Sequence, residues 1–175
     1  LYELGDPRAS VPEFDEAIRL NPRLATAWLN RGRSLLGMER TADAEQNFDR
    51  AIELDPRMAE AFVNRAICRK ARDARAAFED LTEAIRLDPE FPEAYYQRGQ
   101  LHTDPRKALP DLDRAIRLRP AYYEAIFHRS SVRHKLGDFD GAIEDCDRAL
   151  AIHPKSANAL ANRANARFMK RDYVR

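Results

Sequence analysis

The chain has 175 residues, of which 44% are hydrophobic and 34% are charged, a composition typical of a folded, helix-rich protein and not of a disordered segment. Its 30 lysine and arginine residues nearly balance its 29 aspartate and glutamate residues, and the formal net charge of +1 argues against a general nucleic-acid binder. No apolar run approaches the roughly 18 residues that a membrane-spanning helix needs, so membrane insertion is not expected. The compartment is left open, with a cytoplasmic location favoured.

A repeated phrase gives the chain a nearly fixed period. The phrase reads Ala-Ile/Leu-x-Ile/Leu-x-Pro, and it ends at Pro22, Pro56, Pro89, Pro120 and Pro154. These prolines stand 34, 33, 31 and 34 residues apart. Because proline cannot continue a helix, each phrase predicts a helix that ends just before its proline.

Two further sets of residues repeat with the same period. A large apolar residue and, four residues later, a small residue follow each proline: Trp28 and Gly32, Phe62 and Ala66, Tyr95 and Gly99, Ile126 and Ser130, Leu160 and Ala164. Small, large and small residues precede the next proline: Ala44-Phe48-Ala51, Ala77-Leu81-Ala84, Ala108-Leu112-Ala115 and Ala142-Cys146-Ala149. Intervals of three and four place each set on one helix face, so every unit is predicted to contain two amphipathic helices.

The phase of these patterns predicts where the repeats begin and end. In chain order we expect a partial repeat over 1–22, complete repeats over 23–56, 57–89, 90–120 and 121–154, and a partial repeat over 155–175. The second and third complete repeats are short, so we expect tight turns near Arg72 and Thr103, or shorter helix ends beside them. Pro12 and Pro110 predict a late start or a kink in their helices.

The pattern that several of these residues form resembles that of a known family. The pattern Trp28-x-x-Arg31-Gly32-x-x-Leu35, followed by Ala44-x-x-x-Phe48 and Pro56, resembles the tetratricopeptide repeat, with Arg31 where leucine is usual. The resemblance covers residues 1–175 and implies a single array, an all-α superhelical solenoid of stacked antiparallel helix pairs. It also implies that the first helices line a concave groove, where ligands usually lie. No polar capping unit closes either end, so we expect a longer array or self-association through the uncapped ends.

On this resemblance, three sets of first-helix residues are candidates for a peptide groove. One is an apolar strip, one is a row of mostly amide side chains beside it, and one follows the strip by four residues. They are Leu29, Val63, Tyr96, Phe127 and Ala161; Asn30, Asn64, Gln97, His128 and Asn162; and Arg33, Ile67, Gln100, Ser131 and Asn165. Amides donate and accept hydrogen bonds, so this row can grip an extended peptide backbone or can satisfy neighbouring helices.

Acidic residues stand near the start of three predicted first helices. Glu60, Glu93 and Glu124 favour a ligand that carries lysine or arginine, or they stabilise the positive end of the helix dipole. The lysines by which some relatives hold the acidic tails of chaperones are replaced here by apolar residues such as Leu29 and Val63. That replacement argues against this class of partner.

One arginine follows the amide row in each first helix. The set is Arg31, Arg65, Arg98, Arg129 and Arg163. Acids of the second helices share one position, and we predict bidentate ion pairs between Arg65 and Asp80, Arg98 and Asp111, and Arg129 and Asp145. Asn47 replaces the acid in the first complete repeat and is expected to leave Arg31 less well matched. The alternative interpretation of the arginines is a site for an acidic or phosphorylated ligand.

The sequence lacks the patterns typical of catalysis or metal binding. No glycine pattern cradles a phosphate, no histidine pair has metal-ligand spacing, and no serine or cysteine stands in a nucleophile context. Cys68 and Cys146 are predicted to be small apolar packing residues. We therefore predict no enzymatic activity, no cofactor and no metal. The predicted function is a scaffold or adaptor for a protein or an extended peptide. Alternatives are a noncatalytic, substrate-positioning arm of a larger enzyme and a self-assembling repeat scaffold.

Overall fold

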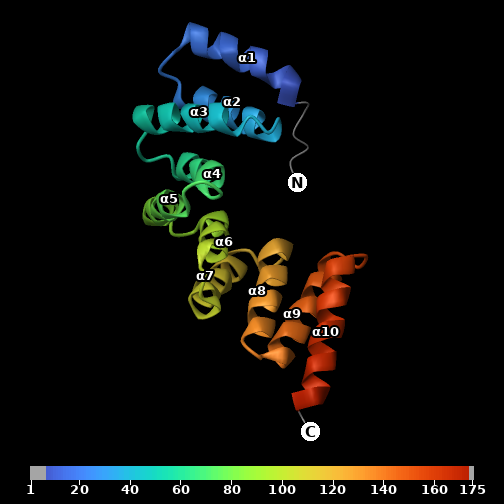
Figure 1. The fold of residues 1–175 in the computed structure, drawn as a ribbon. Coiled ribbons are helices and arrows are strands. Elements are labelled where there is room, and N and C mark those ends of the chain that lie inside the picture. Colours follow the sequence, from blue (N-terminus) through green and yellow to red (C-terminus); the bar gives the residue numbers. More distant parts are fainter. Residues whose placement is uncertain (1–6, 174–175) are drawn as a thin grey trace. The chain divides into compact units, whose positions relative to one another are not determined.

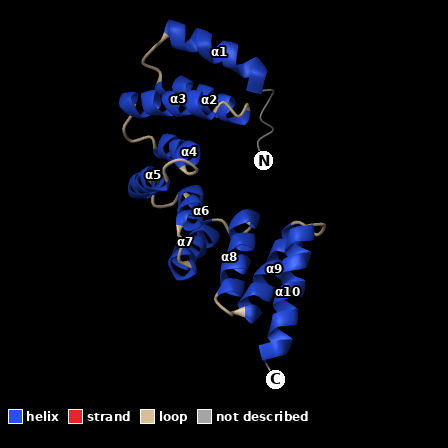
Figure 2. Cartoon of the chain, in the orientation of Figure 1, coloured by secondary structure: helices blue, strands red, loops and turns tan. Residues whose placement is uncertain are grey.

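A computed structural model describes residues 7–173, and all ten elements in this range are α-helices (Figures 1 and 2). They divide between two compact units, which meet in the sequence at Pro89 and Glu90. Unit 1 contains α1 (Pro7–Leu20), α2 (Ala25–Gly37), α3 (Thr41–Leu54), α4 (Ala59–Arg69) and α5 (Ala74–Leu87). Unit 2 contains α6 (Pro92–Leu101), α7 (Pro105–Leu118), α8 (Tyr123–Lys135), α9 (Phe139–Ile152) and α10 (Ala157–Tyr173). The prediction of an all-α fold is confirmed for the described residues.

Within each unit, every helix packs against the next helix along the chain. In unit 1, α2 packs on α3 and α4 packs on α5, while α1 contacts α2 and α3 contacts α4. In unit 2, α6 packs on α7 and α8 on α9, while α7 contacts α8 and α9 contacts α10. Because the connections are only a few residues long, neighbouring helices run antiparallel. Each unit is therefore a stack of helical hairpins.

The repeated proline stands two residues beyond the end of each second helix. These helices end at Leu20, Leu54, Leu87, Leu118 and Ile152, and the prolines at 22, 56, 89, 120 and 154 follow them. The predicted link between the phrase and the helix ends is thus confirmed. A local signal suffices here because the ring of proline removes a backbone donor wherever it stands.

The turn after α8 depends on a residue in the left-handed region. Gly137 has a φ of 79°, and the N–H of Asp138 donates across the turn to the carbonyl oxygen of Arg133 at 3.0 Å. Glycine suits this position because a Cβ strains a backbone with positive φ. The side chain of Asp138 then accepts from the N–H of Gly141 and caps α9. One short segment therefore ends α8 and begins α9.

The two short repeats lose their missing residues from the ends of the first helices. α4 has 11 residues and α6 has 10, whereas α2 and α8 have 13 each. The second of the two expected outcomes, shorter helix ends, is the one found.

Of the two outcomes predicted for Pro12 and Pro110, the late helix start is wrong, and the kink stays a prediction. α1 begins at Pro7 and α7 begins at Pro105, so each internal proline is the sixth residue of its helix. In α7 the proline is exposed, while Ala108 and Leu112 on the opposite side are buried. Packing of that apolar face compensates for the one backbone hydrogen bond that each proline removes.

Small residues allow the close approach of helices in unit 1. Ala44 and Ala51 of α3 have no exposed surface, and neither has Phe48 between them. A Cβ added to Gly32 of α2 would lie only 2.6 Å from Cε1 of Phe48. The phenyl ring therefore occupies the space that the missing side chain leaves, and glycine is required there.

Both cysteines are buried and free, as expected for packing residues. Cys68 packs in the core cluster of unit 1 that also contains Leu29 and Phe48. Burial raises the pKa of the Cys68 thiol to about 11 and also raises the pKa of Cys146. The thiolate, which is the reactive species, is therefore scarce at neutral pH.

The contact between Gly32 and Phe48 generates a matched pair of substitutions. We expect Gly32→Ala to lower the free energy of unfolding by about 1–2 kcal/mol, although alanine favours helices, because a buried aromatic ring must move. At the corresponding position of unit 2, a Cβ on Gly99 would meet side-chain atoms of Leu112 at 3.2 Å. We expect Gly99→Ala to change the free energy of unfolding by less than about 0.5 kcal/mol, since a leucine can shift slightly and alanine favours the helix. Urea unfolding followed by circular dichroism measures both values, and equal losses would contradict this account.

Candidate functional site

The arginine of α4 is held by carboxylates of two second helices. Arg65 donates from Nε to Oδ2 of Asp80 at 3.0 Å and from Nη2 to Oδ1 of Asp80 at 2.5 Å, so this pair is bidentate. Its Nη1 donates to Oδ1 of Asp49 in α3 at 2.8 Å. The side chain of Asp80 is only 7% exposed. Arg65 therefore joins α3, α4 and α5.

Unit 2 contains the same arrangement around Arg129 of α8. Its Nε and Nη2 donate to the two carboxylate oxygens of Asp145 in α9, at 2.9 and 2.5 Å. Its Nη1 donates to Oδ1 of Asp113 in α7 at 2.7 Å. In the hairpin of α6 and α7, Arg98 makes a bidentate pair with Asp111 at 2.8 and 2.7 Å. The three pairs that the sequence suggested thus lie together in the structure.

Four of the five arginines contact a further carboxylate position that was not predicted from the sequence. It stands sixteen residues before the arginine, in the preceding second helix, and four arginines have such an acid: Asp15 for Arg31, Asp49 for Arg65, Asp113 for Arg129 and Asp147 for Arg163. The constant interval is the signal that could have revealed it. Sixteen residues before Arg98 the sequence has Thr82, so the set is interrupted there.

Arg31 has fewer carboxylate partners than Arg65 and Arg129, as the sequence predicted. Its Nη1 donates to Oδ1 of Asn47 at 3.1 Å, and its Nε donates to Oδ1 of Asp15 at 2.7 Å. The amide oxygen of Asn47 thus accepts one hydrogen bond, while Asp15 of α1 supplies the negative charge that pairs with Arg31. Arg31 thus keeps one carboxylate partner, Asp15, while Asn47 supplies an uncharged acceptor.

Arg65 and Arg129 each have a second arginine four residues later, and a shared carboxylate offsets the repulsion. Asp145, which has no exposed surface, also accepts from Nη1 of Arg133 at 3.0 Å. Asp80 likewise accepts from Nη1 of Arg69 at 3.1 Å. Each of these buried carboxylates therefore serves two guanidinium groups.

The carboxylates keep these arginines charged despite burial. Burial alone lowers the pKa of Arg65, but hydrogen bonds and charge interactions with Asp80 and Asp49 outweigh it, so the pKa is raised overall. Arg129 behaves in the same way with Asp145 and Asp113. Because the guanidinium donors already point at protein carboxylates, the arrangement favours internal ion pairs over a site for an acidic ligand.

Two residues of the expected apolar strip do not offer their side chains to a ligand. Leu29 is 5% exposed and Val63 is 2% exposed. Leu29 packs with Phe48 and Cys68 in the core cluster of unit 1. Their inclusion in a peptide groove was therefore wrong, because a short aliphatic side chain at this position is covered by its neighbours. Ile67, four residues after Val63, is half-buried and remains partly accessible.

The strip is different in unit 2, where its members are aromatic and partly exposed. Tyr96 of α6 and Phe127 of α8 are half-buried and pack against the core cluster of the unit. The ring of Tyr96 lies 5.0 Å from that of Tyr122 and meets His128 edge-on at 6.3 Å. Phe127 stacks in parallel on Tyr123 at 6.0 Å. Ala161 of α10 is exposed. These residues give unit 2 an accessible aromatic face.

The amide row is partly engaged within the protein. Asn64 donates to the backbone oxygen of Glu60 at 2.8 Å, Gln97 donates to Oε1 of Glu93 at 3.0 Å, and Asn162 donates to Oγ of Ser131 at 3.0 Å. Burial lowers the pKa of His128, with a smaller contribution from Lys135, so the imidazole is neutral at pH 7. Three amides therefore stabilise the helices themselves.

The remaining groove candidates are more accessible. Within residues 7–173, Asn30 and Asn165 make no side-chain hydrogen bond, and Asn165 is exposed. Gln100 is half-buried. Arg33 of α2 forms an ion pair with Glu60 of α4 at 3.0 Å. The accessible polar groups are thus few and widely spaced.

Two of the three acids at the helix starts are also used internally. Glu60 pairs with Arg33, and Glu93 accepts from the hydroxyl of Tyr122 and lies 3.9 Å from Nη1 of Arg119. Glu124 is exposed and has no ion-pair partner within residues 7–173. An acidic row along the first helices is therefore reduced to one accessible carboxylate in unit 2.

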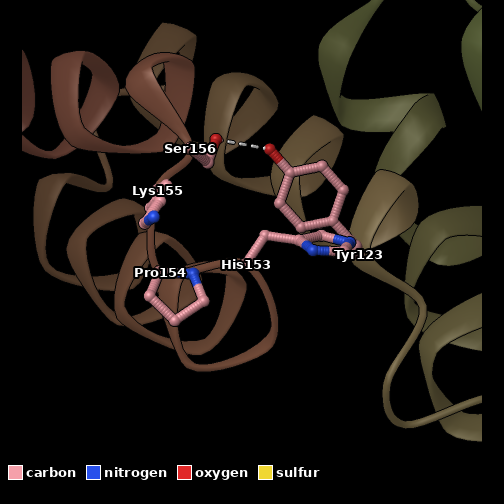
Figure 3. A pocket seen from close by; sticks show the side chains of 5 residues that line it. All are labelled: Tyr123, His153, Pro154, Lys155 and Ser156. Atoms are coloured by element: carbon pink, nitrogen blue, oxygen red, sulfur yellow. Dashed lines mark hydrogen bonds between the residues drawn. The ribbon is translucent and has the colours of Figure 1, made fainter.

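A depression of about 530 Å³ lies beside the aromatic face of unit 2 and was not predicted from the sequence. Its lining consists of Tyr123 at the start of α8 and of His153, Pro154, Lys155 and Ser156 between α9 and α10 (Figure 3). Tyr123 and Phe127 are four residues apart on α8, a spacing that places them on one helix face. The spacing does not reveal the depression itself, because the other lining residues stand 30 or more positions later in the sequence.

The described residues carry no sign of a metal centre or a membrane span. Among residues 7–173, no three histidine, cysteine, aspartate or glutamate side chains are grouped so that they could hold a metal ion. None of the described helices combines the length and the apolar character needed to cross a bilayer.

Stacked helical hairpins with an arginine between successive pairs define a helical repeat protein. The family model for the tetratricopeptide repeat matches residues 1–57, 29–69 and 102–157, and the chain belongs to the tetratricopeptide repeat family. No match was found among curated proteins.

Solved structures agree with this family. YrrB, described as a tetratricopeptide repeat protein with an unusual peptide-binding site, is 25% identical with a TM-score of 0.73, over 90% of this chain and 84% of YrrB. TTC0263, a thermophilic protein of the same family from Thermus thermophilus, is 22% identical with a TM-score of 0.76, over 95% and 93% of the two chains. A chain of the APC/C hetero-tetramer Cut9–Hcn1 is 20% identical with a TM-score of 0.83, over 98% of this chain and 35% of that one. The last two likenesses concern the fold alone.

The two carboxylates on Arg129 generate a second matched pair of substitutions. We expect Asp145→Asn to lower the free energy of unfolding by about 3–5 kcal/mol, because Arg129 and Arg133 lose the buried carboxylate that they share. Asp113 binds the same guanidinium, but its side chain is 42% exposed. We expect Asp113→Asn to cost less than about 1 kcal/mol, as for other exposed pairs. Chemical denaturation of the two variants tests this difference, and similar losses would show that the buried pair has no special role.

Proposed function

We propose that this chain is a protein-binding scaffold that holds an extended peptide on the accessible face of its first helices. The observation that carries the proposal is the contrast between two neighbouring positions in unit 2. Arg98 and Arg129 are paired with carboxylates of the second helices, whereas Tyr96 and Phe127 keep part of their rings exposed. Partly exposed aromatic side chains on a rigid helical frame are well suited to peptide recognition.

The aromatic face of unit 2, formed by Tyr96, Phe127 and Ala161, lies on α6, α8 and α10. Apolar side chains of a peptide would cover the rings of Tyr96 and Phe127. Asn165, which is exposed, would bond to the peptide backbone, because an amide can both donate and accept. The likeness to YrrB, whose description includes a peptide-binding site, supports this proposal.

Unit 1 would contribute less to peptide binding. With Leu29 and Val63 buried, its accessible first-helix residues are Asn30, Arg33 and Ile67. Arg33 is already paired with Glu60. Binding there would be polar and weaker, since little apolar area can be covered.

The family consists in general of noncatalytic scaffolds, and we propose the same for this chain. The repeat boundaries at Pro22, Pro56, Pro89, Pro120 and Pro154 remain a prediction. So do self-association and a role as an arm of a larger enzyme. Leu20 of α1 and Leu160 and Phe168 of α10, which are 69%, 43% and 65% exposed, are apolar residues that self-association would engage.

A pair of alanine-to-arginine substitutions tests the peptide face. Peptides are first selected from a random displayed library on the unmodified chain, and their affinity is then measured by fluorescence anisotropy. We expect Ala161→Arg, at the exposed end of the aromatic face, to weaken binding by about tenfold or more through steric exclusion. Ala42→Arg, on an exposed position of α3, should leave the affinity unchanged. Equal affinity of both variants, or the absence of any selected peptide, would contradict the proposal.

A further inference from the structure

The depression in unit 2 is walled by rings. The ring of Tyr123 stands edge-to-face with His153, with centroids 4.5 Å apart and an interplanar angle of 77°. Pro154 and the stem of Lys155 complete the side that belongs to the connection between α9 and α10 (Figure 3). Its volume of about 530 Å³ is large enough for one or two side chains. The walls thus present mainly carbon to whatever enters.

The two hydroxyl groups of the walls already have partners. The hydroxyl of Tyr123 and Oγ of Ser156 are hydrogen-bonded at 2.6 Å, as the dashed line in Figure 3 marks. Oγ of Ser156 also accepts from the N–H of Ala159 at 3.2 Å and so caps α10. An apolar side chain can therefore enter without leaving a buried hydroxyl unpaired, a loss that would oppose binding.

The rim of the depression is basic. Lys155 is exposed and has no carboxylate partner among the side chains that the structure describes, those of residues 8–170. None of the five lining residues is acidic, and His153 is exposed as well. Glu124 follows Tyr123 in α8 but does not line the depression. An anionic group at the rim could thus form an ion pair with the ammonium group of Lys155.

The depression also continues the face assigned to peptide binding. Tyr123, which forms one wall, stacks in parallel on Phe127, with ring centroids 6.0 Å apart. A peptide that covers Phe127 therefore has the depression directly beside it. An occupant supplied by the same peptide is favoured over a separate small molecule.

We propose that the depression recognises an apolar residue followed by an acidic residue inside a bound peptide. The apolar side chain lies between Tyr123 and Pro154, and the carboxylate of the next residue pairs with Lys155. A single ammonium beside carbon walls suits a carboxylate, whereas a phosphate group is usually held by several arginines or backbone donors. This inference rests on the proposed peptide-binding function and adds a sequence preference to it.

The test is an NMR titration with blocked peptides. The probes are acetyl-Gly-Leu-Glu-Gly-amide, the same peptide with Gln in place of Glu, and the same peptide with Ala in place of Leu. We expect the first probe to shift the amide signals of Lys155 and Ser156 and the ring signals of Tyr123. We expect both altered peptides to bind about fivefold more weakly, because one lacks an exposed ion pair and the other lacks apolar contact.

Two lysine variants test whether Lys155 recognises the carboxylate of the peptide. We expect Lys155→Gln to abolish the preference for the Glu peptide over the Gln peptide. Lys135→Gln, at an exposed lysine of α8 that does not line the depression, should preserve this preference. Circular dichroism verifies that both variants fold. Equal binding of the Glu and Gln peptides to the unmodified chain would overturn the inference.

Two further outcomes separate this inference from the proposed function. Shifts at Phe127 and Ala161 without shifts at Lys155 and Ser156 would overturn the inference and leave the peptide-binding proposal standing. Stronger binding of acetyl-Gly-Gly-Leu with a free terminal carboxylate would also overturn it, because the depression would then recognise a chain end. Failure of every probe to shift any signal of unit 2 would count against both.

Discussion

The positions of the hairpins α4–α5 and α8–α9 depend on a guanidinium group that lies between two second helices. Arg65 joins Asp49 to Asp80, and Arg129 joins Asp113 to Asp145. Apolar packing drives the stacking of helices, but it tolerates more than one register, whereas a buried charge without a partner is costly. A shifted stack would leave both an arginine and an aspartate unpaired. The ion pairs therefore select one register among those that the alanine and leucine contacts allow.

This constraint also decides which residues remain for recognition. The arginine side chains of unit 2 are directed to the second helices. Tyr96 and Phe127, each two positions before such an arginine, have side chains that remain partly exposed. The proposed peptide face is thus aromatic and nearly neutral, with Glu124 and Lys155 as isolated charges. Such a face would select a peptide by shape and by a few placed contacts, in contrast to one that attracts any acidic chain.

Most of the fold could be predicted from the sequence, and less of the site. Prolines such as Pro56 end helices through local chemistry, and the pairing of Arg129 with Asp145 follows from a period that one hairpin already contains. The contact of Asp113 with Arg129 was not predicted, because Asp113 belongs to the preceding hairpin and the residues at its position in the repeat are largely exposed. Leu29 and Val63 were expected to be accessible, yet their burial depends on neighbouring helices. The depression at Tyr123 is assembled from two segments 30 residues apart, at Tyr123 and His153, and no single repeat contains it.

The most direct measurement of the internal role of the arginines is NMR of their side-chain Nε–H groups in the presence of inorganic phosphate. If the carboxylates of the second helices hold these groups, the Nε–H signals of Arg65 and Arg129 will exchange slowly with water and keep their positions when phosphate is added in excess. The exposed Arg19, paired with Glu16, will exchange rapidly and provides the reference. Rapid exchange of Arg65 and Arg129, or shifts that saturate with phosphate, would show that these arginines bind ligands, and the account would be contradicted.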